Sequence, residues 1–412
     1  MRILAIASLY PLAADDYVGT HQHLNFRSLI ARGHEVEVIR PQMRFYQWLS
    51  RNWKRKGGRP VPRRYVLDDV PVDCPRFWRL PGRKWRAHEA AWRHAPIARV
   101  ARRAHEHKPF DIIYGCELTP DGVSAVRLSR ELKLPVMLSS IGSDAHTYPY
   151  QCERIMAQTR IVLRESDLIL VEAEGAIADI RKLTEESAPV HVFNRGIDLA
   201  RYQNAPSREE QRRNLGLPLR HRLIIFVGSV NEGKGVRVLA EAFTKVHSAF
   251  PDADLVFMGT GPLAEWLRKT AAAGGWRDRL HLLGRRPFTE VPQVLLACDI
   301  FCLPSFGEGL PKSVVEGMAA GLPVVVTNVG GIPDIMRHGE SGIMIPPRDP
   351  EALAGALSRL LASPAEAARM GRTGREIAYR EFDTDKNATG ILKFAEEAIA
   401  RGKARMAGMK SA

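Results

Sequence analysis

Short apolar runs alternate with longer stretches of helical hydrophobic periodicity through the first half of the chain. The runs lie at residues 3–8, 35–39, 112–114, 136–139, 168–171 and 190–193. Each is rich in aliphatic or β-branched residues and too short for a helix, which is typical of parallel strands buried on both faces. Gly33 closes the first helical stretch just before the second run, as expected for a helix C-terminus. The pattern predicts an α/β domain over residues 1–198.

The alternation restarts after a polar stretch at residues 199–221, which contains Pro206 and Pro218 and which we interpret as an interdomain linker. The later runs lie at 223–227, 255–258, 280–283, 299–303, 324–327 and 342–345. Since 412 residues exceed what one hydrophobic core usually organises, we expect a second α/β domain over residues 222–378. Residues 379–412 are expected to form a helix that crosses back to the first domain. Ligands of such sheets bind beyond the carboxyl ends of the strands, so the functional residues should lie in the loops that follow them.

Composition places the chain among globular proteins, with 45% hydrophobic and 26% charged residues. No apolar run approaches the roughly 20 residues that span a bilayer. The first eight residues read as a buried strand and not as a signal peptide, because one charge precedes a brief apolar stretch that runs into Tyr10 and Pro11. The five cysteines have neither the spacing of a disulfide framework nor that of a zinc site. These features predict a cytoplasmic protein.

The net charge of +14 is local, because nearly all of the excess of Lys and Arg falls between residues 44 and 108. Aromatic residues are interleaved with these cations, as in the segments 76–79 and 83–86. Rings at the headgroup level beside cations suit an anionic lipid surface. Two alternatives stay open: aromatic residues in a core with solvated cations around it, and nucleic-acid binding, against which stands the lack of any nucleic-acid module. We predict peripheral attachment to the inner face of a membrane and no nucleic-acid partner.

The most informative stretch is residues 304–325, which leaves an apolar run, turns through glycines and opens a helix near Pro311, a residue favoured at the first helical position. This places Glu308 in the loop and Glu316 on the second turn of the helix. The amides at the helix start would form an anion site, namely those of Lys312, Ser313 and Val314. Carboxylates on either side of an anion site suit the recognition of hydroxyl groups. Taken alone, the stretch is also compatible with an ordinary βα unit that carries two solvated glutamates.

The same stretch resembles glycosyltransferase family 4 of the GT-B fold, through the pattern E-x7-E followed by G-M-A-x-G-x-P-V-V. Seven further motifs stand in the family's order over about 130 residues, at 226–235, 257–262, 283–284, 299–305, 330–334, 339–342 and 346–350. The resemblance implies two Rossmann-like domains facing each other across a cleft, with a nucleotide-sugar donor on the second domain. It also implies a retaining reaction that needs no metal ion and no cofactor besides the donor, which we expect to be linked to UDP or GDP.

The resemblance assigns roles to residues of the second domain. Glu316 should hold the ribose hydroxyls, and Lys234 should neutralise the leaving diphosphate. Glu308 should contact the donor sugar together with the residues after it, which are Gly309, Leu310, Pro311, Lys312 and Ser313. Gly228 and Gly284 belong to the donor loops, and Ser229 stands where the family usually has arginine. Arg285 is a candidate for the missing cation, and an ordinary surface charge is the alternative.

The first domain matches the family more weakly. Gly19 could let the backbone approach the diphosphate or the acceptor closely. His21 and His23 alternate as metal ligands sometimes do, but acceptor-side or surface histidines fit a metal-independent fold better. Ser143 and Asp144 resemble the loop that contacts the transferred sugar, although Ile141 replaces the usual histidine or arginine just before it.

The prediction is a glycosyltransferase that moves a sugar to a lipid-linked or polysaccharide acceptor, and the pattern is nearest to members that build bacterial surface polysaccharides. Two alternatives remain. One is a sugar-nucleotide epimerase of the same fold. The other is a basic protein that binds polysaccharide or membrane and has lost turnover, for which Ser229 and Ile141 are the only support.

Overall fold

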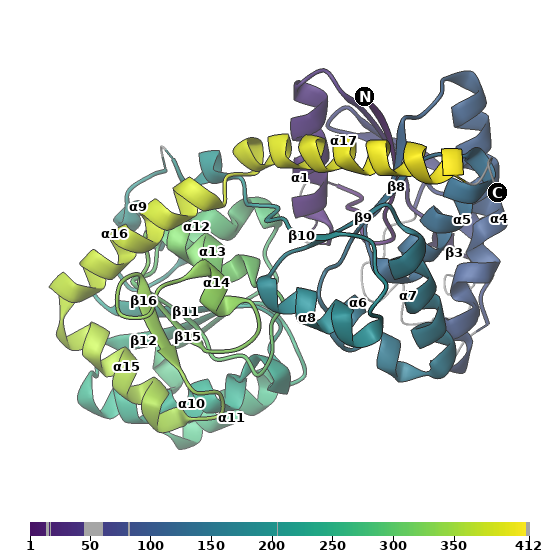
Figure 1. Ribbon diagram of the computed structural model, residues 1–412. Helices are drawn as coiled ribbons and strands as arrows, with labels where there is room; N and C mark the ends of the chain where they lie inside the picture. Colours follow the sequence, from purple (N-terminus) through teal and green to yellow (C-terminus); the bar gives the residue numbers. More distant parts are fainter. Residues whose placement is uncertain (14–15, 17, 45–60, 81–82, 204, 409–412) are drawn as a thin grey trace. The chain divides into compact units, whose positions relative to one another are not determined.

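The computed structural model describes residues 1–13, 16, 18–44, 61–80, 83–203 and 205–408. The chain divides into two compact units, each a layered α/β structure (Figure 1). The first unit comprises Met1–Arg195 and Thr384–Ala412, and the second comprises Gly196–Asp383. None of the described helices is both long enough and apolar enough to span a membrane.

The first unit is built on an eight-stranded sheet in the order β10-β9-β8-β7-β1-β2-β5-β4, in which only β4 pairs antiparallel. Its strands are β1 (Arg2–Ile6), β2 (Glu35–Ile39), β4 (Arg64–Leu67), β5 (Val70–Asp73), β7 (Ile112–Gly115), β8 (Val136–Ser139), β9 (Leu168–Val171) and β10 (Val190–Val192). A separate parallel pair joins β3 (Gln42–Met43) to β6 (Arg76–Phe77). The hairpin β4–β5 and the pair β3–β6 were not expected from the hydrophobic pattern, because these strands are only two to four residues long.

Helices cover both faces of this sheet, so successive residues of a strand enter different cores. Leu4 and Ile6 pack with α4 (Glu89–His107), α5 (Val123–Leu132), α7 (Glu153–Glu165) and α8 (Glu174–Leu183). Ile3 and Ala5 pack with α1 (Thr20–Ala31) and with α17 (Thr384–Gly408), which contact each other and cross in Figure 1. The carboxyl-terminal helix is thus part of the first unit, and it begins at Thr384, whereas residues 379–383 belong to the second unit.

The second unit contains a six-stranded parallel sheet in the order β13-β12-β11-β14-β15-β16. Its strands are β11 (Arg222–Val227), β12 (Ala253–Met258), β13 (Leu280–Gly284), β14 (Ile300–Leu303), β15 (Val324–Thr327) and β16 (Gly342–Ile345). Its main helices are α9 (Arg208–Leu215), α10 (Val236–Ala249), α11 (Ala264–Ala273), α12 (Val291–Leu296), α13 (Lys312–Ala319), α15 (Pro350–Ala362) and α16 (Pro364–Glu381), and a short turn, α14, covers Ile332–Ile335. The strand order reverses between β11 and β14. Such a switch point is where doubly wound sheets bind their ligands.

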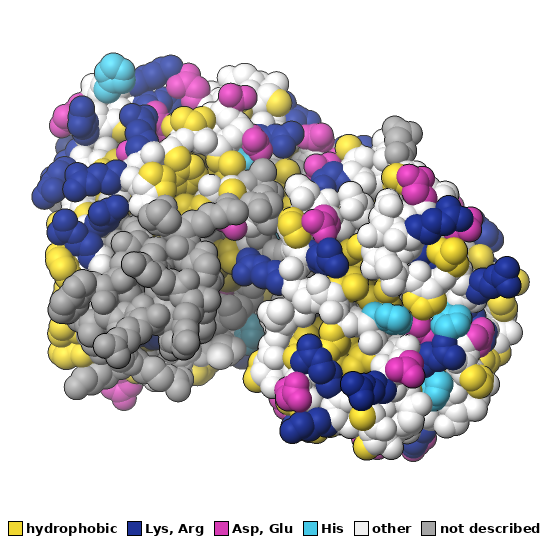
Figure 2. All heavy atoms as spheres, turned by 180° about the vertical axis from the view of Figure 1, so that it is seen from behind, with side chains coloured by type: hydrophobic (Ala, Val, Ile, Leu, Met, Phe, Trp, Pro, Cys, Tyr) yellow, Lys and Arg dark blue, Asp and Glu magenta, His cyan; other side chains and the backbone are white. Residues whose placement is uncertain are grey.

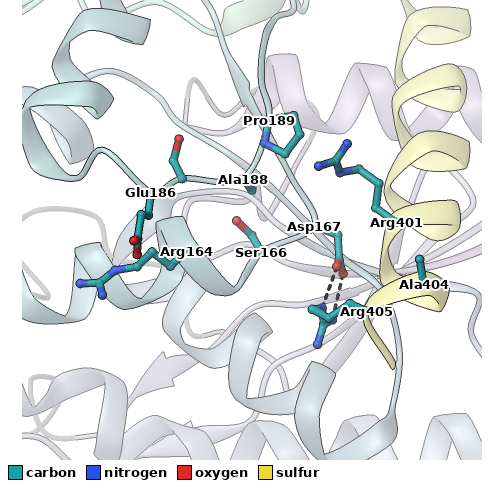
Figure 3. Close-up of a pocket in the computed structure, with 10 residues that line it drawn as sticks. Arg164, Ser166, Asp167, Glu186, Ala188, Pro189, Arg401, Ala404 and Arg405 are labelled. Carbon is teal, nitrogen blue, oxygen red and sulfur yellow. Dashed lines mark hydrogen bonds and ion pairs between the residues drawn. The ribbon is translucent and has the colours of Figure 1, made fainter. Parts of the chain in front are cut away.

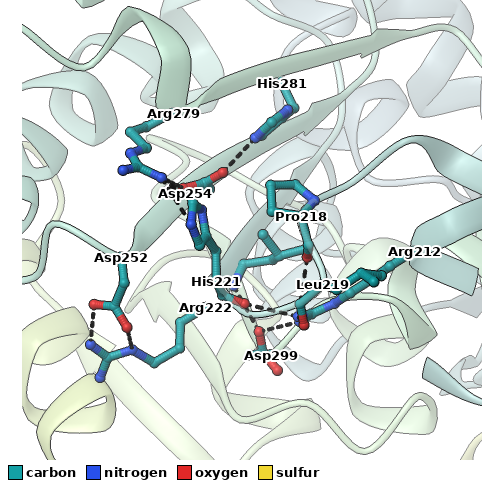
Figure 4. Close-up of polar contacts among 11 residues, drawn as sticks. Arg212, Pro218, Leu219, His221, Arg222, Asp252, Asp254, Arg279, His281 and Asp299 are labelled. Carbon is teal, nitrogen blue, oxygen red and sulfur yellow. Dashed lines mark hydrogen bonds and ion pairs between the residues drawn. The ribbon is translucent and has the colours of Figure 1, made fainter. Parts of the chain in front are cut away.

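The stretch expected as a linker, residues 199–221, lies within the second unit and is ordered there as the 3-10 helix η4 (Leu199–Tyr202) and as α9. Arg212 of α9 accounts for much of this order, because its guanidinium donates to the carbonyls of Leu219 and His221 and to Asp299, at 2.9, 2.9 and 2.6 Å (Figure 4). The polar composition that suggested a linker therefore reflects side chains that hydrogen-bond to the body of the unit.

A buried carboxylate fixes the amino ends of three strands of the same sheet. Asp254 of β12 is fully buried. Its oxygens lie 2.9 Å from Nδ1 of His221, just before β11, and 2.6 Å from Nε2 of His281 on β13 (Figure 4). The network lies at the edge opposite to the ligand-binding edge and has a structural explanation, since it satisfies a carboxylate that burial would otherwise leave unpaired.

Candidate functional site

The loop after β11 is held in place by the loop after β14, the neighbouring strand at the point where the strand order reverses. Asn231 caps the short helix η5 (Glu232–Lys234) by accepting a hydrogen bond from the Lys234 amide at 3.1 Å. The amide of Phe306, in the loop after β14, donates to the Gly233 carbonyl at 2.9 Å. Gly235 has a φ of 69°, and a Cβ at this position would collide with the carbonyl of Pro304. A side chain is excluded there, so the two loops pack closely enough to position Lys234.

Lys234 and Glu308 come together across the switch point. The Nζ atom of Lys234 donates to Oε1 of Glu308 at 2.6 Å, and the side chains are 31% and 8% exposed. The Glu308 backbone is fixed in turn by Gly330, whose φ is 56° and whose missing Cβ leaves room for the Glu308 carbonyl. A partly exposed cation is thus held by a carboxylate on a rigid loop, where an anionic ligand can compete for it.

Glu316 lies on the second turn of α13 and is buried, with 6% of the residue exposed. Burial raises the pKa of this carboxyl to about 7, although Arg201 and Lys312 oppose the shift. Near it, the Tyr202 hydroxyl is buried and has no hydrogen-bond partner among the described residues. Burial raises the pKa of Tyr202 well above its usual range, and the charge of Glu316 adds to the effect. The carboxyl and the hydroxyl are therefore two buried polar groups that a ligand could satisfy.

Arg201 is a further residue near Glu316, and it was not anticipated from the sequence. Its guanidinium lies 4.3 Å from the ring centroid of Phe288 and donates to the Phe288 carbonyl at 2.6 Å. Arg201 and Tyr202 belong to η4, inside the segment that the sequence indicated as a linker. The only available signal was the pair of large side chains in an otherwise polar stretch.

The start of α13 differs in one respect from the expected anion site. Pro311 precedes the helix, which begins at Lys312, and the amide of Val314 donates to the Pro311 carbonyl at 3.0 Å. Of the three amides expected to face a ligand, that of Val314 is therefore engaged in a turn of the chain itself. Leu310 is buried, at 7% exposure, and anchors the loop.

The remaining donor-side residues follow strands β11 and β13. Gly228 and Ser229 follow β11, and the carbonyl of Gly228 occupies the space beside Gly259 that a Cβ would fill. Gly284 ends β13 with a φ of 69° and is followed by the exposed Arg285. A second cation, Arg348, lies after β16 with its guanidinium 4.4 Å from the ring centroid of Phe306. Since the Phe306 amide bonds to the Lys234 loop, Arg348 is an additional candidate for the cation that Ser229 does not supply.

A buried ion pair organises the corresponding switch point of the first unit, between β1 and β7. Arg93 of α4 pairs with Asp121, and the two are 1% and 0% exposed. Asp121 also accepts from the Ser8 amide at 2.8 Å and from the Ser8 hydroxyl at 2.6 Å. Arg93 belongs to the basic segment and reads as a surface cation in the sequence. Its partners become visible only when the sheet brings residues 8 and 121 together.

Asp144 lies at the same edge, and its contacts are with its own chain. One oxygen accepts from the Leu118 amide at 2.8 Å, and the other accepts from the Ser140 hydroxyl and the Ile141 amide at 2.7 and 2.9 Å. Burial raises its pKa, while these hydrogen bonds oppose the shift. The contacts show a carboxylate that ties the loops after β7 and β8 together, so contact with a sugar would have to come from its neighbours.

These loops line a pocket of about 270 Å³ that includes both Ser143 and Asp144. The other lining residues are Arg79, Arg86, Glu89, Glu117, Thr119, Pro120, Ile141 and Tyr148. Burial raises the pKa of Glu117 to about 9, and the nearby Asp121 and Asp144 add to the effect. Glu117 is therefore a protonated, hydrogen-bond-donating carboxyl at neutral pH. It follows a buried strand next to β1, a position from which its place at the ligand-binding edge could have been inferred.

Gly19 and His23 belong to the loop after β1 and to α1. Gly19 has a φ of 77°, and a Cβ there would collide with the Leu9 carbonyl, so close packing within the loop already requires glycine. His23 is buried, with Nδ1 2.7 Å from the Tyr10 hydroxyl and Nε2 3.1 Å from Asp68. Burial lowers its pKa. Neither residue lines the pocket of Ser143 and Asp144. Over the described part of the chain, no three His, Cys, Asp or Glu side chains are grouped to hold a metal ion.

The comparisons with known proteins follow this division into two units. The sequence profile described as "Glycosyl transferases group 1" matches residues 207–377, and that described as "Glycosyl transferase 4-like domain" matches residues 18–196. The chain belongs to glycosyltransferase family 4. Two family members illustrate the match. A Bacillus subtilis (strain 168) protein named as a teichuronic acid biosynthesis glycosyltransferase is 28% identical over 95% of this chain and 97% of its own. A D-inositol 3-phosphate glycosyltransferase of Corynebacterium glutamicum (strain R) is 30% identical over 65% of each chain.

Similar solved structures place this chain in the GT-B fold, with two Rossmann-like domains. Anabaena HepE in complex with UDP superposes with a TM-score of 0.72 at 18% identity, over 95% of this chain and 99% of that one. Sucrose-phosphate synthase from Thermosynechococcus elongatus gives 0.75 at 19% identity, over 97% and 99%. The expected fold class is thereby confirmed.

Proposed function

We propose that the chain is a retaining glycosyltransferase that needs no metal ion and moves a sugar from a UDP- or GDP-linked donor to a lipid-linked or polysaccharide acceptor in bacterial surface-glycan synthesis. The observation that carries the proposal is the contact of Lys234 with Glu308 at the switch point of the second unit, with the buried Glu316 on the helix that follows the Glu308 loop. A nucleotide diphosphate sugar needs a cation, a sugar-hydroxyl acceptor and a ribose-hydroxyl acceptor, and these three side chains supply them. The complex of HepE with UDP-glucose supports a UDP-linked donor.

The donor would exchange the internal contacts of the site for its own. The diphosphate would take the Lys234 ammonium away from Glu308, which frees the Glu308 carboxylate to accept hydrogen bonds from the sugar. Glu316 would accept from the ribose hydroxyls, near the Tyr202 hydroxyl, which has no partner within the described part of the chain. Each exchange gives a polar group of the site a hydrogen-bond partner on the donor.

We propose a same-face displacement for the reaction. The acceptor oxygen forms a bond to the anomeric carbon on the face from which the diphosphate leaves, so the configuration is retained. The departing diphosphate oxygen takes the electron pair of the broken bond, and the acceptor hydroxyl proton passes to that phosphate. Lys234 stabilises the charge that develops on the diphosphate.

The acceptor is proposed to bind the pocket of Ser143 and Asp144 in the first unit. Arg79, Arg86 and the protonated Glu117 line this pocket and would donate hydrogen bonds to an oxygen-rich glycan. Two relatives support a surface glycan, the teichuronic acid enzyme and a Salmonella typhimurium (strain LT2) protein named as a colanic acid biosynthesis glycosyltransferase, which is 26% identical over 87% of this chain.

Attachment to the inner face of a membrane is proposed through the basic segment. Residues 45–60, which hold many of its cations and aromatic rings, lie outside the described residues. In the described part, Trp78 and Leu80 are 60% and 47% exposed at a pocket of about 390 Å³, and the Arg44 guanidinium lies 5.3 Å from the Trp78 ring centroid. Lys and Arg side chains gather along one margin of the first unit on the face in Figure 2. Exposed rings beside cations suit an anionic lipid interface.

Vesicle sedimentation tests this attachment. The protein should pellet with phosphatidylglycerol vesicles at low salt and should pellet less with Trp78→Ser, while Tyr150→Ser serves as the control, since Tyr150 is a similarly exposed aromatic residue of the same unit. Absence of any pelleting at low salt would contradict the membrane assignment.

A transfer assay tests the enzymatic proposal. The purified protein is incubated with nucleotide sugars and with glycan acceptors, and the product and its anomeric configuration are determined by NMR. Lys234→Ala and Glu316→Ala should each abolish transfer, whereas Lys269→Ala and Glu376→Ala, which change exposed residues of the same unit, should not. Full activity in Lys234→Ala and Glu316→Ala would refute the site. Epimerised donor without transfer would indicate an epimerase, and binding without any turnover would indicate a degenerate binding protein.

A further inference from the structure

The pocket of Ser143 and Asp144 has two carboxyl groups on its wall that the protein already engages. Glu89 pairs with Arg79, and their side chains are 17% and 13% exposed. Asp144 receives the three hydrogen bonds described above, from two backbone amides and the Ser140 hydroxyl. Neither carboxyl group therefore requires a ligand to satisfy it.

Glu117 lines the same pocket but lacks such a partner. Elsewhere in this unit a buried carboxylate is matched by an arginine: Asp121 pairs with Arg93, and Asp167 accepts from Arg405 at 2.8 and 3.0 Å (Figure 3). Among the described residues, none hydrogen-bonds to the Glu117 side chain. Burial raises the pKa of Glu117 to about 9, which keeps it protonated at neutral pH. Neither of its carboxyl oxygens is sealed from solvent, so its O–H group can donate to a ligand in the pocket.

Three further groups of the pocket carry donors, namely the Arg86 guanidinium and the hydroxyls of Ser143 and Tyr148. Within the described part of the chain, none of these groups has a hydrogen-bond partner. Burial raises the pKa of Tyr148, Glu89 and Glu117 add to the shift, and Arg86 opposes it. The Tyr148 hydroxyl thus lies within electrostatic reach of both Arg86 and Glu117.

The groups without a partner favour an anion over a neutral sugar. Each of them can donate a hydrogen bond, and the one charge among these four groups is that of Arg86. Neutral sugars present hydroxyls that donate as well as accept, and a carboxylate with unused acceptor sites suits them. An anionic group only accepts, and a guanidinium binds a carboxylate or a phosphate through parallel hydrogen bonds.

The charge distribution along the chain points the same way. Nearly all of the net charge of +14 falls between residues 44 and 108, and this segment supplies Arg79 and Arg86 to the pocket. A concentrated positive field raises the local concentration of an acidic ligand and speeds its association. This observation rests on composition, so it is independent of the hydrogen bonds in the pocket.

We propose that this pocket holds an anionic group of the acceptor, a carboxylate or a phosphate, with Arg86 as its cation and Ser143, Tyr148 and Glu117 as further donors. The acceptor is then an acidic glycan, a conclusion that rests on the proposed function, since that function assigns the pocket to the acceptor. A neutral glycan would leave the Arg86 guanidinium without a partner.

Isothermal titration of the full-length protein with three small sugars tests the proposal. Methyl β-glucuronide carries a carboxylate, glucose 6-phosphate carries a phosphate, and methyl β-glucoside is the neutral reference. Saturating UDP occupies the proposed donor site, so that the sugar phosphate does not bind there. At least one charged sugar should bind about tenfold or more tightly than the neutral sugar, which is the effect of a charge-assisted hydrogen bond.

Variants locate this preference in the pocket. Arg86→Gln should remove it, because the cation is lost from an exposed position that tolerates the change. Arg99→Gln is the matched control, since it removes an exposed cation of α4 that does not line the pocket, and it should keep the preference. Tyr148→Phe should weaken binding of the charged sugar more than that of the neutral sugar. Tighter binding of the glucuronide supports the proposal with a carboxylate, and tighter binding of glucose 6-phosphate supports it with a phosphate.

Three outcomes would overturn the proposal: equal affinities for the charged and neutral sugars, absence of binding by all three sugars, and equal losses in Arg86→Gln and Arg99→Gln. The titrations need no glycosyl transfer, and the transfer assay can succeed with a neutral acceptor. A failure of this proposal is therefore distinguishable from a failure of the proposed function.

Discussion

Protonation of Glu316 should control the affinity for the donor near neutral pH. Burial raises the pKa of this carboxyl to about 7. Only the ionised carboxylate accepts hydrogen bonds from both ribose hydroxyls, because the protonated form gives up one acceptor site. About nine-tenths of the Glu316 carboxyls are ionised at a pH of about 8, and about one-tenth are ionised at a pH of about 6. The association constant for a nucleotide sugar should therefore fall about tenfold between these values.

Isothermal titration with a nucleotide sugar measures this effect directly. The intact donor is preferable to free UDP, because the terminal phosphate of UDP titrates in the same range. Glu316→Gln should bind more weakly at a pH of about 8 and should lose the pH dependence, since its amide does not titrate. An unchanged pH dependence in Glu316→Gln, or a flat profile in the wild type, would refute the reasoning.

The stability of the ligand-free protein as a function of pH gives an independent check. The pKa of Glu316 is higher in the folded protein than its usual value near 4.5, so the folded state favours the protonated form. This contribution to stability is complete below the unfolded pKa and is lost as the pH rises through about 7. At a pH of about 8, ligand-free Glu316→Gln should therefore unfold at a higher temperature than the wild type.

Three further predictions concern the two switch points. Glu117→Gln should raise the unfolding temperature at a pH above about 9, as measured by calorimetry. The reason is that burial raises the pKa of Glu117 to about 9, so that its ionised form destabilises the folded wild type. Equal unfolding temperatures of the two proteins at this pH would contradict the assignment. Gly330→Ala should reduce both donor affinity and stability, because its Cβ would meet the Glu308 carbonyl at a φ of 56°; unaltered donor titration would refute this. Arg93→Met should destabilise the protein by about 3–5 kcal/mol in denaturant unfolding, because Asp121 would be left buried and unpaired; adding Asp121→Asn should restore part of the loss, and additive losses would argue against the pair.

The strands and the family could be predicted from the sequence because their signals are local. A parallel strand covered on both faces is a short apolar run whatever its partners are, so β7, β8 and β9 are visible in the sequence. The approach of Lys234 to Glu308 could also be anticipated, since both loops follow strands of one sheet. The E-x7-E pattern then placed Glu316 on the helix after the second loop.

The remaining features depend on contacts between distant residues. Arg93 reads as one more cation of a basic segment until the sheet brings Ser8 and Asp121 to it. The segment with Arg201 and Tyr202 reads as a linker because its polar side chains give no sign of the carbonyls and carboxylates that they meet. Asp144 reads as a sugar ligand until the amide of Leu118 is seen to donate to it. In each case at least one partner lies tens of residues away, beyond the reach of local periodicity.

The central claim is that Lys234 and Glu316 bind one nucleotide sugar at the switch point of the second unit. A crystal structure of the protein with the preferred nucleotide diphosphate tests it most directly. The account predicts the diphosphate within hydrogen-bonding distance of the Lys234 ammonium and both ribose hydroxyls on the Glu316 carboxylate. A nucleotide bound elsewhere, or one that leaves Lys234 paired with Glu308 and contacts neither residue, would contradict the account.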